Sequence, residues 1–522
     1  MFEYLRRLAT TGAAYTASSV LSKLIAVFLL PVYTAYLTPS DYGAAEVMLA
    51  SVVAASIVVR FGVIEAILRF YYVAEEDRRA VIATGFASLF WGATAGALIA
   101  LAFAEPISEA LIDRPDAELA RLAILGLWTL TLWEYVLTLL RLDERARAYL
   151  TITVVNVAVT IPVTVWLVVV EDQGAEGILL GTFGTGVIFL AWRLWQERRR
   201  LSLVWRGTLL RRMLRFGLPT MPAELSLYSL NFIDRVLVAR LAGLAEAGLY
   251  ALAIKFGQGM NVIARGFQLA WPPLAYSIAD DDEARRAYSL VFTWFAAVCA
   301  FGVVGLWLDA RWLVRFLASE EFFGAYEAIG PLATGVSLYA LYLVLVVILG
   351  RTGRTGFSFP AAFAGTAVNV GLNLVLIPAL GILGAGLALV ASYALVLALT
   401  YVFTQRLFPV PYEWGRLALL VAAAAATVAV GETLLPTDGA AGLLGRTALW
   451  LAFPALLWVS GFLTDAERRS LRAMLRPAAV RERLRELRTG PAAEEGRTAE
   501  RGGRLGPEVY EAAARDEERT GF

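Results

Sequence analysis

Long apolar stretches alternate with short polar ones along most of this chain, up to about residue 464. A helix needs about 20 mostly apolar residues to cross the hydrocarbon core of a membrane. By that criterion the pattern predicts an all-α integral membrane protein with about 14 transmembrane helices. The predicted helices are 12–37, 43–68, 81–104, 118–140, 149–170, 174–195, 214–241, 248–271, 288–308, 325–349, 357–378, 382–404, 414–435 and 441–463.

The arginines are distributed regularly in the gaps between these apolar stretches. They cluster in every second gap between predicted helices, as at Arg78 and Arg79 and in the run from Arg198 to Arg215. Because excess Lys and Arg mark the cytoplasmic side, the pattern predicts a multi-pass protein of the cytoplasmic (inner) membrane with both termini in the cytoplasm. The exceptions, in gaps predicted to be external or at a helix end, are Arg114, Arg121, Arg240, Arg311, Arg315 and Arg446.

The first apolar stretch, residues 11–37, follows Arg6 and Arg7 in the way that a signal peptide would. It is longer than a signal h-region, is interrupted by Lys23 and has no clear small-residue cleavage site. We therefore expect it to remain as the first membrane helix.

The composition fits a membrane protein and removes several kinds of chemistry. Of 522 residues, 59% are hydrophobic and 17% charged, whereas soluble domains are about one quarter charged. Cys299 is the only cysteine and there is no histidine, which removes disulfide frameworks, thiol metal clusters and the commonest general base. The sequence has no phosphate-cradling glycine loop and no catalytic or metal motif. We expect no enzyme activity, no cofactor and no nucleic-acid partner.

The longest predicted cytoplasmic gap, 193–215, divides the chain near its seventh helix. We expect an N-terminal six-helix bundle at 1–200, a second at 201–408, helices 13 and 14 at 409–464, and a charged cytoplasmic tail at 465–522. Within the tail, 465–488 is predicted to form a basic amphipathic helix on the inner membrane face. Residues 490–522 have little to bury and are predicted to be disordered.

The seventh and eighth predicted helices carry side chains that membrane helices usually avoid. Ionisable groups at that depth are expensive and normally face a water-filled path or a partner. At 100° per residue, the eighth helix gathers its polar residues within about a third of its circumference. On the seventh helix Glu224, Tyr228, Asn231 and Arg235 form a narrow stripe with Asp234 beside it, and the polar residues on the eighth are Lys255, Gln258, Asn261 and Arg265.

The first half of the chain repeats part of this arrangement. The first hairpin ends at Gly43 and the later one at Gly248, and an arginine follows each glycine at the same spacing, Arg60 and Arg265. Arg60 shares a helix face with Ser56 and Glu46, and Lys23 lies within the first predicted helix. Polar residues at equivalent positions of a membrane repeat are how many transporters form a central site.

The deep charges lean towards the basic side, which favours an anionic ligand. Arginine suits phosphate in particular because its guanidinium donates two parallel hydrogen bonds. The predicted cargo is therefore a phosphate-bearing amphiphile. The structural alternative is that the basic residues pair with carboxylates between helices, for example Asp234 with Arg235 or Lys255. Asn369 and Asn373, one turn apart, are expected to bond to neighbouring helices.

Three stretches resemble the polysaccharide and O-antigen flippases of the multidrug/oligosaccharidyl-lipid/polysaccharide (MOP) exporter superfamily. They are SSVLSKLIAVFLLPVYTAYLTPSDYGAAEVM from Ser18, FGLPTMPAELSLYSLNFIDRVLVARLAGLAEAGLYALA from Phe216, and NVGLNLVLIPALGILGAGLALVASY from Asn369. The resemblance implies two six-helix bundles in a V around a central cavity, with two further C-terminal helices. It implies transport of undecaprenyl-diphosphate-linked oligosaccharide from the inner to the outer leaflet by alternating access.

The resemblance also suggests site residues. Lipid II flippases of the superfamily use basic residues on the first, second and eighth helices, and Lys23, Arg60 and Arg265 occupy similar places here. The expected substrate-binding set is Lys23, Arg60, Asn231, Lys255, Gln258, Asn261 and Arg265, with Glu224, Asp234 and Arg235 as coupling or ion-pair residues.

Two other functions remain open. Ion-coupled drug exporters of the same superfamily would be expected to have acid-dominated cavities. A membrane-bound polysaccharide polymerase or ligase would be expected to carry a large external loop with catalytic groups. The expected partners are the lipid-linked oligosaccharide, membrane lipids, and the polymerase and glycosyltransferases of the same biosynthesis.

Overall fold

The computed structural model describes residues 29–72, 77–143, 145–465 and 467–469. The chain divides into two units, Met1–Pro454 and Ala455–Phe522, and the account below concerns the first. Lys23, nearly all of the first predicted helix and most of the tail lie outside the described residues.

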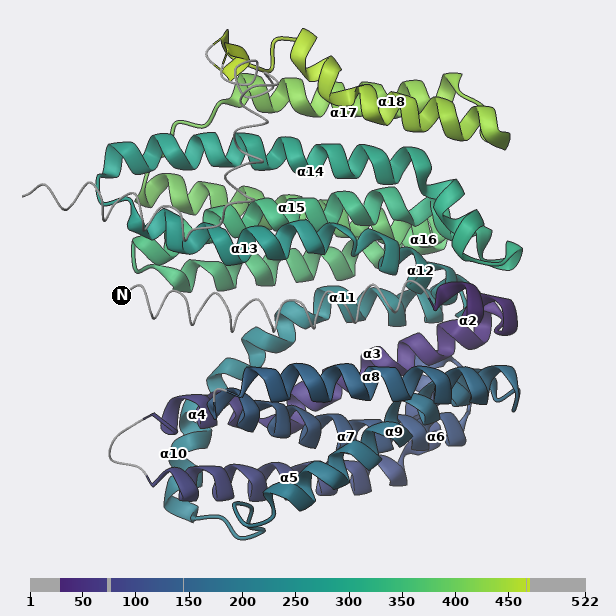
Figure 1. Cartoon of the computed structure of the whole chain (residues 1–522), viewed down its shortest axis with the longest axis vertical. Coiled ribbons are helices and arrows are strands. Elements are labelled where there is room, and N and C mark those ends of the chain that lie inside the picture. The colour runs from purple at the N-terminus through teal and green to yellow at the C-terminus, as the bar shows by residue number, and fades with distance from the viewer. Residues whose placement is uncertain (1–28, 73–76, 144, 466, 470–522) are drawn as a thin grey trace, which may run out of the picture. The chain divides into compact units, whose positions relative to one another are not determined.

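The first part of the described chain is a group of helices in which α7 packs against α3, α5 and α9. In Figure 1 α4, α5, α7 and α9 lie together, and α8 packs on α9. The helices are α2 (Leu30–Tyr36), α3 (Pro39–Arg60), α4 (Val63–Phe70), α5 (Arg78–Ala102), α6 (Ala104–Ile112), α7 (Ala117–Leu142), α8 (Ala146–Val169), α9 (Gly174–Glu197) and α10 (Gly207–Gly217).

A second group of helices follows, in which α15 packs against α13, α14 and α16, and α17 packs on α14 (Figure 1). The helices are η1 (Leu218–Thr220), α11 (Met221–Leu241), α12 (Leu244–Gly257), α13 (Met260–Ser277), α14 (Asp281–Leu317), η2 (Glu320–Ala325), α15 (Tyr326–Arg351), η3 (Thr355–Phe357), α16 (Ser358–Leu407), α17 (Trp414–Leu434) and α18 (Gly439–Val459).

The described residues contain helices and no strand, and ten helices are long and apolar enough to cross a membrane. The all-α membrane fold is thus confirmed. One of the ten, α16, has 50 residues, about 75 Å, or more than twice the hydrocarbon core. Gly381 interrupts it with φ 58° and ψ −138°, so α16 contains both predicted helices 357–378 and 382–404. The predicted seventh and eighth helices are not among the ten, because α11 carries several charged residues and the eighth is broken into helices of 14 and 18 residues.

Several predicted boundaries are wrong, and in two cases the break falls beside a site residue. The second predicted helix, 43–68, ends at Arg60 because Phe61 and Gly62 adopt left-handed torsions. The eighth, 248–271, is two helices that meet at Gln258 and Gly259. The ninth, 288–308, extends to Leu317 in α14, so much of the predicted external gap after it is helical.

The predicted seventh helix is also divided. Pro219 lies in the short η1 turn between α10 and α11, and Pro222 is in the first turn of α11. Proline lacks an N–H and clashes within a helix interior but is tolerated in a first turn. The polar stripe therefore begins near the start of α11 and is carried by one uninterrupted helix.

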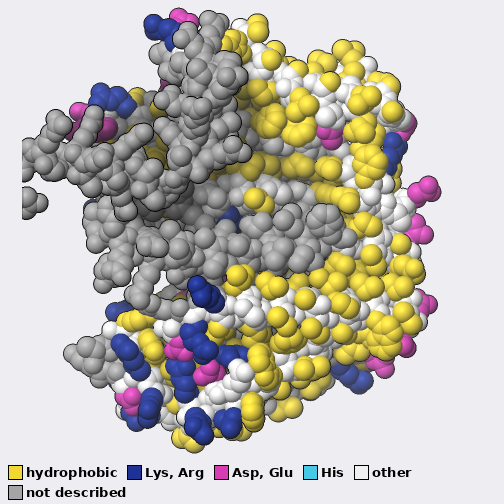
Figure 2. All heavy atoms as spheres, viewed as in Figure 1, with side chains coloured by type: hydrophobic (Ala, Val, Ile, Leu, Met, Phe, Trp, Pro, Cys, Tyr) yellow, Lys and Arg dark blue, Asp and Glu magenta, His cyan; other side chains and the backbone are white. Residues whose placement is uncertain are grey.

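The exposed side chains of the described residues fit a membrane setting. Figure 2 shows hydrophobic side chains over much of the face in view, whereas Lys and Arg gather at its lower left, over the ends of α4, α5 and α10. The exposed arginines there include Arg78, Arg79 and Arg211. This segregation follows the alternation of arginine-rich gaps in the sequence.

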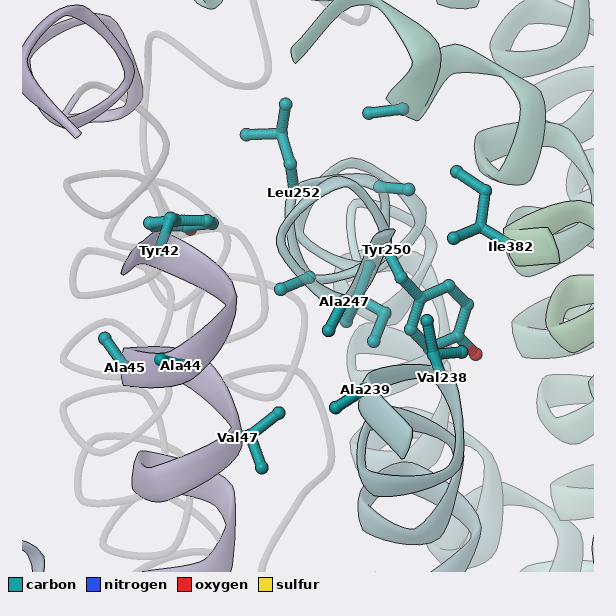
Figure 3. Packing of buried hydrophobic residues seen from close by; sticks show 14 of the residues in the cluster. Tyr42, Ala44, Ala45, Val47, Val238, Ala239, Ala247, Tyr250, Leu252 and Ile382 are labelled. Carbon is teal, nitrogen blue, oxygen red and sulfur yellow. The ribbon is translucent and has the colours of Figure 1, made fainter. Parts of the chain in front are cut away.

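The two groups of helices meet where α3 packs on α11 and α12. Figure 3 shows Ala44 and Val47 of α3 on the side that faces Ala247 of α12 and Ala239 of α11, and all four are buried. Small side chains allow membrane helices to approach closely, so that van der Waals contact is large. This small-residue seam brings the polar residues of α3 within reach of those on α11 and α12.

Candidate functional site

Two glycine contacts mark the ends of the seam between the halves. A Cβ atom on Gly43 would lie 2.1 Å from the Leu244 carbonyl oxygen, and one on Gly248 would lie 2.0 Å from that of Pro39. At the other end of α3, a Cβ atom on Gly62 would lie 2.0 Å from the Gly217 carbonyl oxygen. We call these contacts the Gly43 crossing and the Gly62 crossing. Between them α3 has 22 residues, about 33 Å, close to the hydrocarbon thickness.

Glu46 binds two basic residues of the other half beside the Gly43 crossing. Its Oε1 lies 2.7 Å from Lys255 Nζ on α12, and its Oε2 lies 3.4 Å from Arg235 Nη1 on α11. The Lys255 ammonium also lies 5.1 Å from the centroid of the Tyr42 ring, within range of a cation–π attraction. Only 10% of the Glu46 side chain is exposed. The carboxylate therefore joins three helices in a largely dry setting.

Arg60 forms the corresponding ion pair beside the Gly62 crossing. Its Nη2 lies 2.9 Å from Glu224 Oε1 on α11, and its Nε donates to the Ser56 carbonyl at 3.2 Å. Arg60 is buried, whereas 38% of the Glu224 side chain is exposed. Between the two ion pairs, the Tyr228 hydroxyl donates to the Ala50 carbonyl at 3.1 Å. The predicted stripe on the seventh helix is confirmed as the face that contacts α3.

The pairing of charges differs from the structural alternative that the sequence suggested. Arg235 and Lys255 bind Glu46 and not Asp234. The three basic residues of the seam, Arg60, Arg235 and Lys255, face two carboxylates, Glu46 and Glu224, which leaves a net charge of +1. The basic excess of the predicted site is therefore present but largely balanced by carboxylates of the protein itself.

Asp234 points into the second half and forms a separate polar cluster. Its carboxylate accepts hydrogen bonds from the Tyr250 hydroxyl at 3.0 Å and from Asn373 Nδ2 at 2.6 Å. Asn373 Nδ2 also lies 3.2 Å from Asn369 Oδ1. All three residues of the Asp234–Asn373–Asn369 chain are buried, and Asn369 Nδ2 and Asn373 Oδ1 have no partner among the described residues. The expectation that the asparagines bond to neighbouring helices is confirmed for Asn373, which bonds to α11, whereas Asn369 bonds to Asn373 of its own helix.

The remaining predicted residues are spread along the chain. Arg265 is exposed on α13 and donates to Gln268 Oε1 at 3.2 Å. In the described part of the chain no hydrogen bond or ion pair joins Arg265 to Arg60 or Lys255. Gln258 and Asn261 are half-buried at the junction of α12 and α13, where the backbone N–H of Asn261 donates to the backbone carbonyl of Gln258 at 2.9 Å. Lys23 and the side chain of Asn231 lie outside the described residues.

Arginines that broke the predicted charge alternation have a structural explanation. Arg311 and the buried Arg446 both bind the Glu432 carboxylate, Arg311 at 2.8 Å. Arg315 binds Asp438 and stacks over Phe323 at 4.5 Å. These contacts hold α14 against α17 and the segment before α18. The three arginines are therefore neutralised within the protein and do not contradict the predicted orientation.

A large apolar cavity lies elsewhere in the second group of helices. It has a volume of about 900 Å³ and is bounded by α14, α15, α16 and α17. Its walls include Cys299, Trp307, Leu341, Leu397 and Val421, and Glu432 is its only ionisable carboxylate. None of the predicted site residues lines it.

The sequence placed Glu46 on the same helix face as Arg60 but did not include it among the expected site residues. A further signal was present, since Glu46 lies three residues after Gly43, the glycine of the repeat. Tyr250, the hydroxyl partner of Asp234, was also missed, because tyrosine is common in helix cores and its spacing gave no indication.

Comparison with known families agrees with this geometry. A family profile described as "Polysaccharide biosynthesis protein" matches residues 34–327, which is more than half of the chain and includes α3, α11 and α12. The chain belongs to this family. A search of curated proteins finds no match.

Solved structures with the same fold include flippases and transporters. The chain superposes on the lipid II flippase MurJ in an inward closed conformation with a TM-score of 0.67 and 12% identity, covering 86% of this chain and 99% of that one. For an inward-facing multidrug resistance MATE family transporter of the MOP superfamily, the TM-score is 0.58, the identity 16% and the coverage 76% and 95%. For the MATE multidrug transporter DinF-BH in complex with R6G, the TM-score is 0.55 and the identity 16%, and the match covers 77% of this chain and 95% of that one. The MOP fold suggested by the resemblance is confirmed.

Proposed function

We propose that this protein is a flippase that moves undecaprenyl-diphosphate-linked oligosaccharide from the inner to the outer leaflet of the cytoplasmic membrane by alternating access. The observation that carries the proposal is the row of basic residues along the seam between the halves, Arg60, Arg235 and Lys255. In a polysaccharide biosynthesis family, a cationic site at hydrocarbon depth suits the diphosphate of a lipid-linked sugar.

The chemistry of the basic residues fits a diphosphate. Arg60 offers a planar guanidinium that binds two phosphate oxygens at once, and Lys255 supplies a compact charge. Lys23 and Arg265 would add charge to the same ligand as the halves move. Asn231, Gln258 and Asn261 would offer amide groups to sugar hydroxyls. In this assignment the residues bind and orient the ligand and catalyse no reaction.

The orientation follows from the arginine-rich gaps. The Gly62 crossing, next to the arginines of α4, α5 and α10, would face the cytoplasm, and the Gly43 crossing the outside. Both termini would be cytoplasmic. The bundles 1–200 and 201–408 would rock about the seam, with 409–464 and the tail 465–522 outside the moving core. Polymerase and glycosyltransferases would act before and after the flippase on the same lipid-linked sugar.

Asp234 is proposed to couple transport to a cation or proton. It is a buried carboxylate with neutral partners, Tyr250 and Asn373, and the unpartnered Oδ1 of Asn373 lies beside it. A buried carboxylate without a basic partner is costly unless it gains a proton or a cation. Uptake of either would change the packing of α11 against α12 and α16. Asp234 supplies a single negative charge and its partners Tyr250 and Asn373 are neutral, which favours a monovalent cation or a proton over a divalent cation.

A drug or small-molecule exporter is the second candidate. The MATE fold and the acidic Asp234 cluster favour it, whereas the basic seam favours an anionic cargo. A polymerase or ligase is disfavoured because the described gaps between helices are short and the matched structures are a flippase and transporters.

Ligand binding separates these candidates. Purified protein in detergent would be titrated with undecaprenyl diphosphate, undecaprenyl monophosphate and a cationic dye, with tryptophan fluorescence as the signal. We expect the diphosphate to bind more tightly than the monophosphate, because each added phosphate oxygen forms charge-assisted hydrogen bonds. Tighter binding of the dye than of either lipid would favour the exporter.

A further inference from the structure

Within the described residues, the seam cations Arg60, Arg235 and Lys255 each bind a carboxylate that belongs to the other half of the protein. Glu46 of the first half binds Lys255 and Arg235 of the second, and Glu224 of the second half binds Arg60 of the first. These three cations, which would hold an anionic ligand, are thus already occupied. From this we propose that Glu46 and Glu224 are internal counter-anions that the ligand's diphosphate displaces, and that their displacement releases the two crossings. The inference rests on the proposed function.

Glu46 occupies the place that an anionic ligand would take. Its two oxygens are used separately, one by an ammonium on α12 and one by a guanidinium on α11. A phosphate group offers the same two-oxygen edge with a larger charge and a further oxygen. Lys255 and Arg235 cannot satisfy Glu46 and a diphosphate in the same geometry. Binding of the ligand therefore competes directly with the carboxylate.

The positions of the ion pairs connect this competition to movement. Glu46 lies three residues after Gly43, and Arg60 lies two residues before Gly62. Each crossing can separate only if the ion pair beside it breaks. Breaking a buried pair leaves charges without compensation, which is strongly unfavourable. A crossing thus stays closed until another anion takes over the cations, so an empty carrier would not open freely.

The two carboxylates differ in exposure, which gives the displacement an order. The Glu224 side chain is 38% exposed, whereas that of Glu46 is 10% exposed. A ligand that arrives from the Gly62 side would meet Glu224 first and replace it on Arg60. The more deeply buried Glu46 would be displaced second, next to the crossing that must open for release. This order runs from the inner to the outer side in the proposed orientation.

Neutralising Glu46 tests the inference. In Glu46→Gln the amide keeps the shape of the side chain but loses the charge that competes with the ligand. We expect inorganic diphosphate and undecaprenyl diphosphate each to bind about tenfold more tightly than to wild type, a change typical of removing one close charge contact. Glu224→Gln should act in the same direction with a smaller effect, because Glu224 is more exposed. The matched control is Glu105→Gln, whose carboxylate is exposed on α6 and should leave binding unchanged.

The opening of the Gly43 crossing can be measured separately from ligand binding, by the rate at which a buried cysteine reacts with a maleimide. Val47 is buried in α3 on the same face as Gly43 and points towards α11 and α12 (Figure 3), so a cysteine placed there reacts with a maleimide only when the seam opens. In the Val47→Cys background without ligand, we expect Glu46→Gln to react several-fold faster than the parent. Diphosphate should accelerate the parent and have little further effect on Glu46→Gln.

A charge-swapped variant is the control that separates an effect of charge from a loss of folding. Glu46→Lys combined with Lys255→Glu restores an ion pair across the seam, and should bring the maleimide rate back towards that of the Val47→Cys parent. Unchanged affinity and unchanged reactivity in Glu46→Gln, with wild type still binding undecaprenyl diphosphate, would overturn the inference. If wild type does not bind the lipid, but Glu46→Gln still reacts faster and binds inorganic diphosphate more tightly, the proposed substrate is wrong and the inference stands.

Discussion

Gly43 and Gly248 lie so close together that neither has room for a side chain. A Cβ atom on Gly43 would lie 2.7 Å from the Gly248 amide nitrogen and 2.1 Å from the Leu244 carbonyl oxygen. The sequence presents these glycines as equivalent points of two hairpins, and the structure brings the two points into contact. The contact fixes how closely α3 approaches α12, and hence the distance at which Glu46 meets Lys255.

Replacing Gly248 by alanine should therefore prevent this closure. The added methyl group meets backbone atoms, which cannot rotate away, and such overpacking costs about 1–3 kcal/mol. We expect Gly248→Ala to lower the melting temperature of the purified protein and to increase the reactivity of a cysteine at Val47. Gly266→Ala is the matched control, because Gly266 lies in α13 with nothing within 4 Å of an added Cβ atom. Equal melting temperatures for the two variants would contradict the close contact.

Arg60→Ala should abolish export of the surface polysaccharide although the protein still reaches the membrane. The substitution removes the guanidinium proposed to bind the diphosphate and leaves Glu224 without its partner. Truncating one member of a close charge pair typically costs about 2–5 kcal/mol, or a loss of binding of at least about tenfold. Arg60→Lys keeps the charge without the two-oxygen geometry and should retain partial export.

The same export assay tests Arg265, which the resemblance places in the diphosphate site. Arg265→Ala should also abolish export, with membrane levels checked by immunoblotting. Arg354→Ala serves as control, since Arg354 is exposed near η3 and has no proposed role. Full export by both Arg60→Ala and Arg265→Ala would rule out the cationic site.

Asp234→Asn should uncouple transport from its driving ion with little loss of stability. The amide can still accept from Tyr250 at its oxygen, so the packing of α11 against α12 is retained, but the charge that takes up a proton or cation is gone. Transport into liposomes would be measured with and without imposed Na⁺ and pH gradients. We expect gradient-dependent transport in wild type and none in Asp234→Asn. The same gradient response in both proteins would remove Asp234 from coupling.

A cysteine at Ser202 tests the orientation. Ser202 lies in the arginine-rich segment between α9 and α10, so a membrane-impermeant maleimide should label it only in inside-out vesicles. A cysteine at Asp438, which is exposed in the segment before α18, should be labelled from outside in intact cells. External labelling at Ser202 would refute the assignment of the Gly62 crossing to the cytoplasm.

The features that follow from local chemistry could be predicted from the sequence. Hydrocarbon thickness sets the length of the apolar stretches, which is why the order and approximate position of the membrane helices were found. The stripe of Glu224, Tyr228 and Arg235 was found because helical periodicity places these residues on one face. The kink at Gly381 was anticipated as a short gap because glycine and proline interrupt the apolar sequence there.

The features that depend on distant contacts could not be predicted. Gly62 ends α3 with a left-handed torsion in an apolar sequence, and the reason is its contact with Gly217 of the other half. Glu46 has a partner 189 residues away, so no local spacing indicates which cation it binds. The structural alternative paired Asp234 with Arg235 or Lys255, yet Asp234 and Arg235 are adjacent in a helix and point in different directions.

Transport of a labelled lipid by the purified protein is the most direct test of the proposed function. Protein in liposomes would receive a fluorescent undecaprenyl-diphosphate-linked sugar in both leaflets, and a membrane-impermeant quencher would report the fraction in the outer leaflet over time. We predict that wild type moves the lipid between leaflets and that Arg60→Ala, present at the same density, does not. Failure of wild type to move this lipid, together with movement of a cationic dye, would contradict the account.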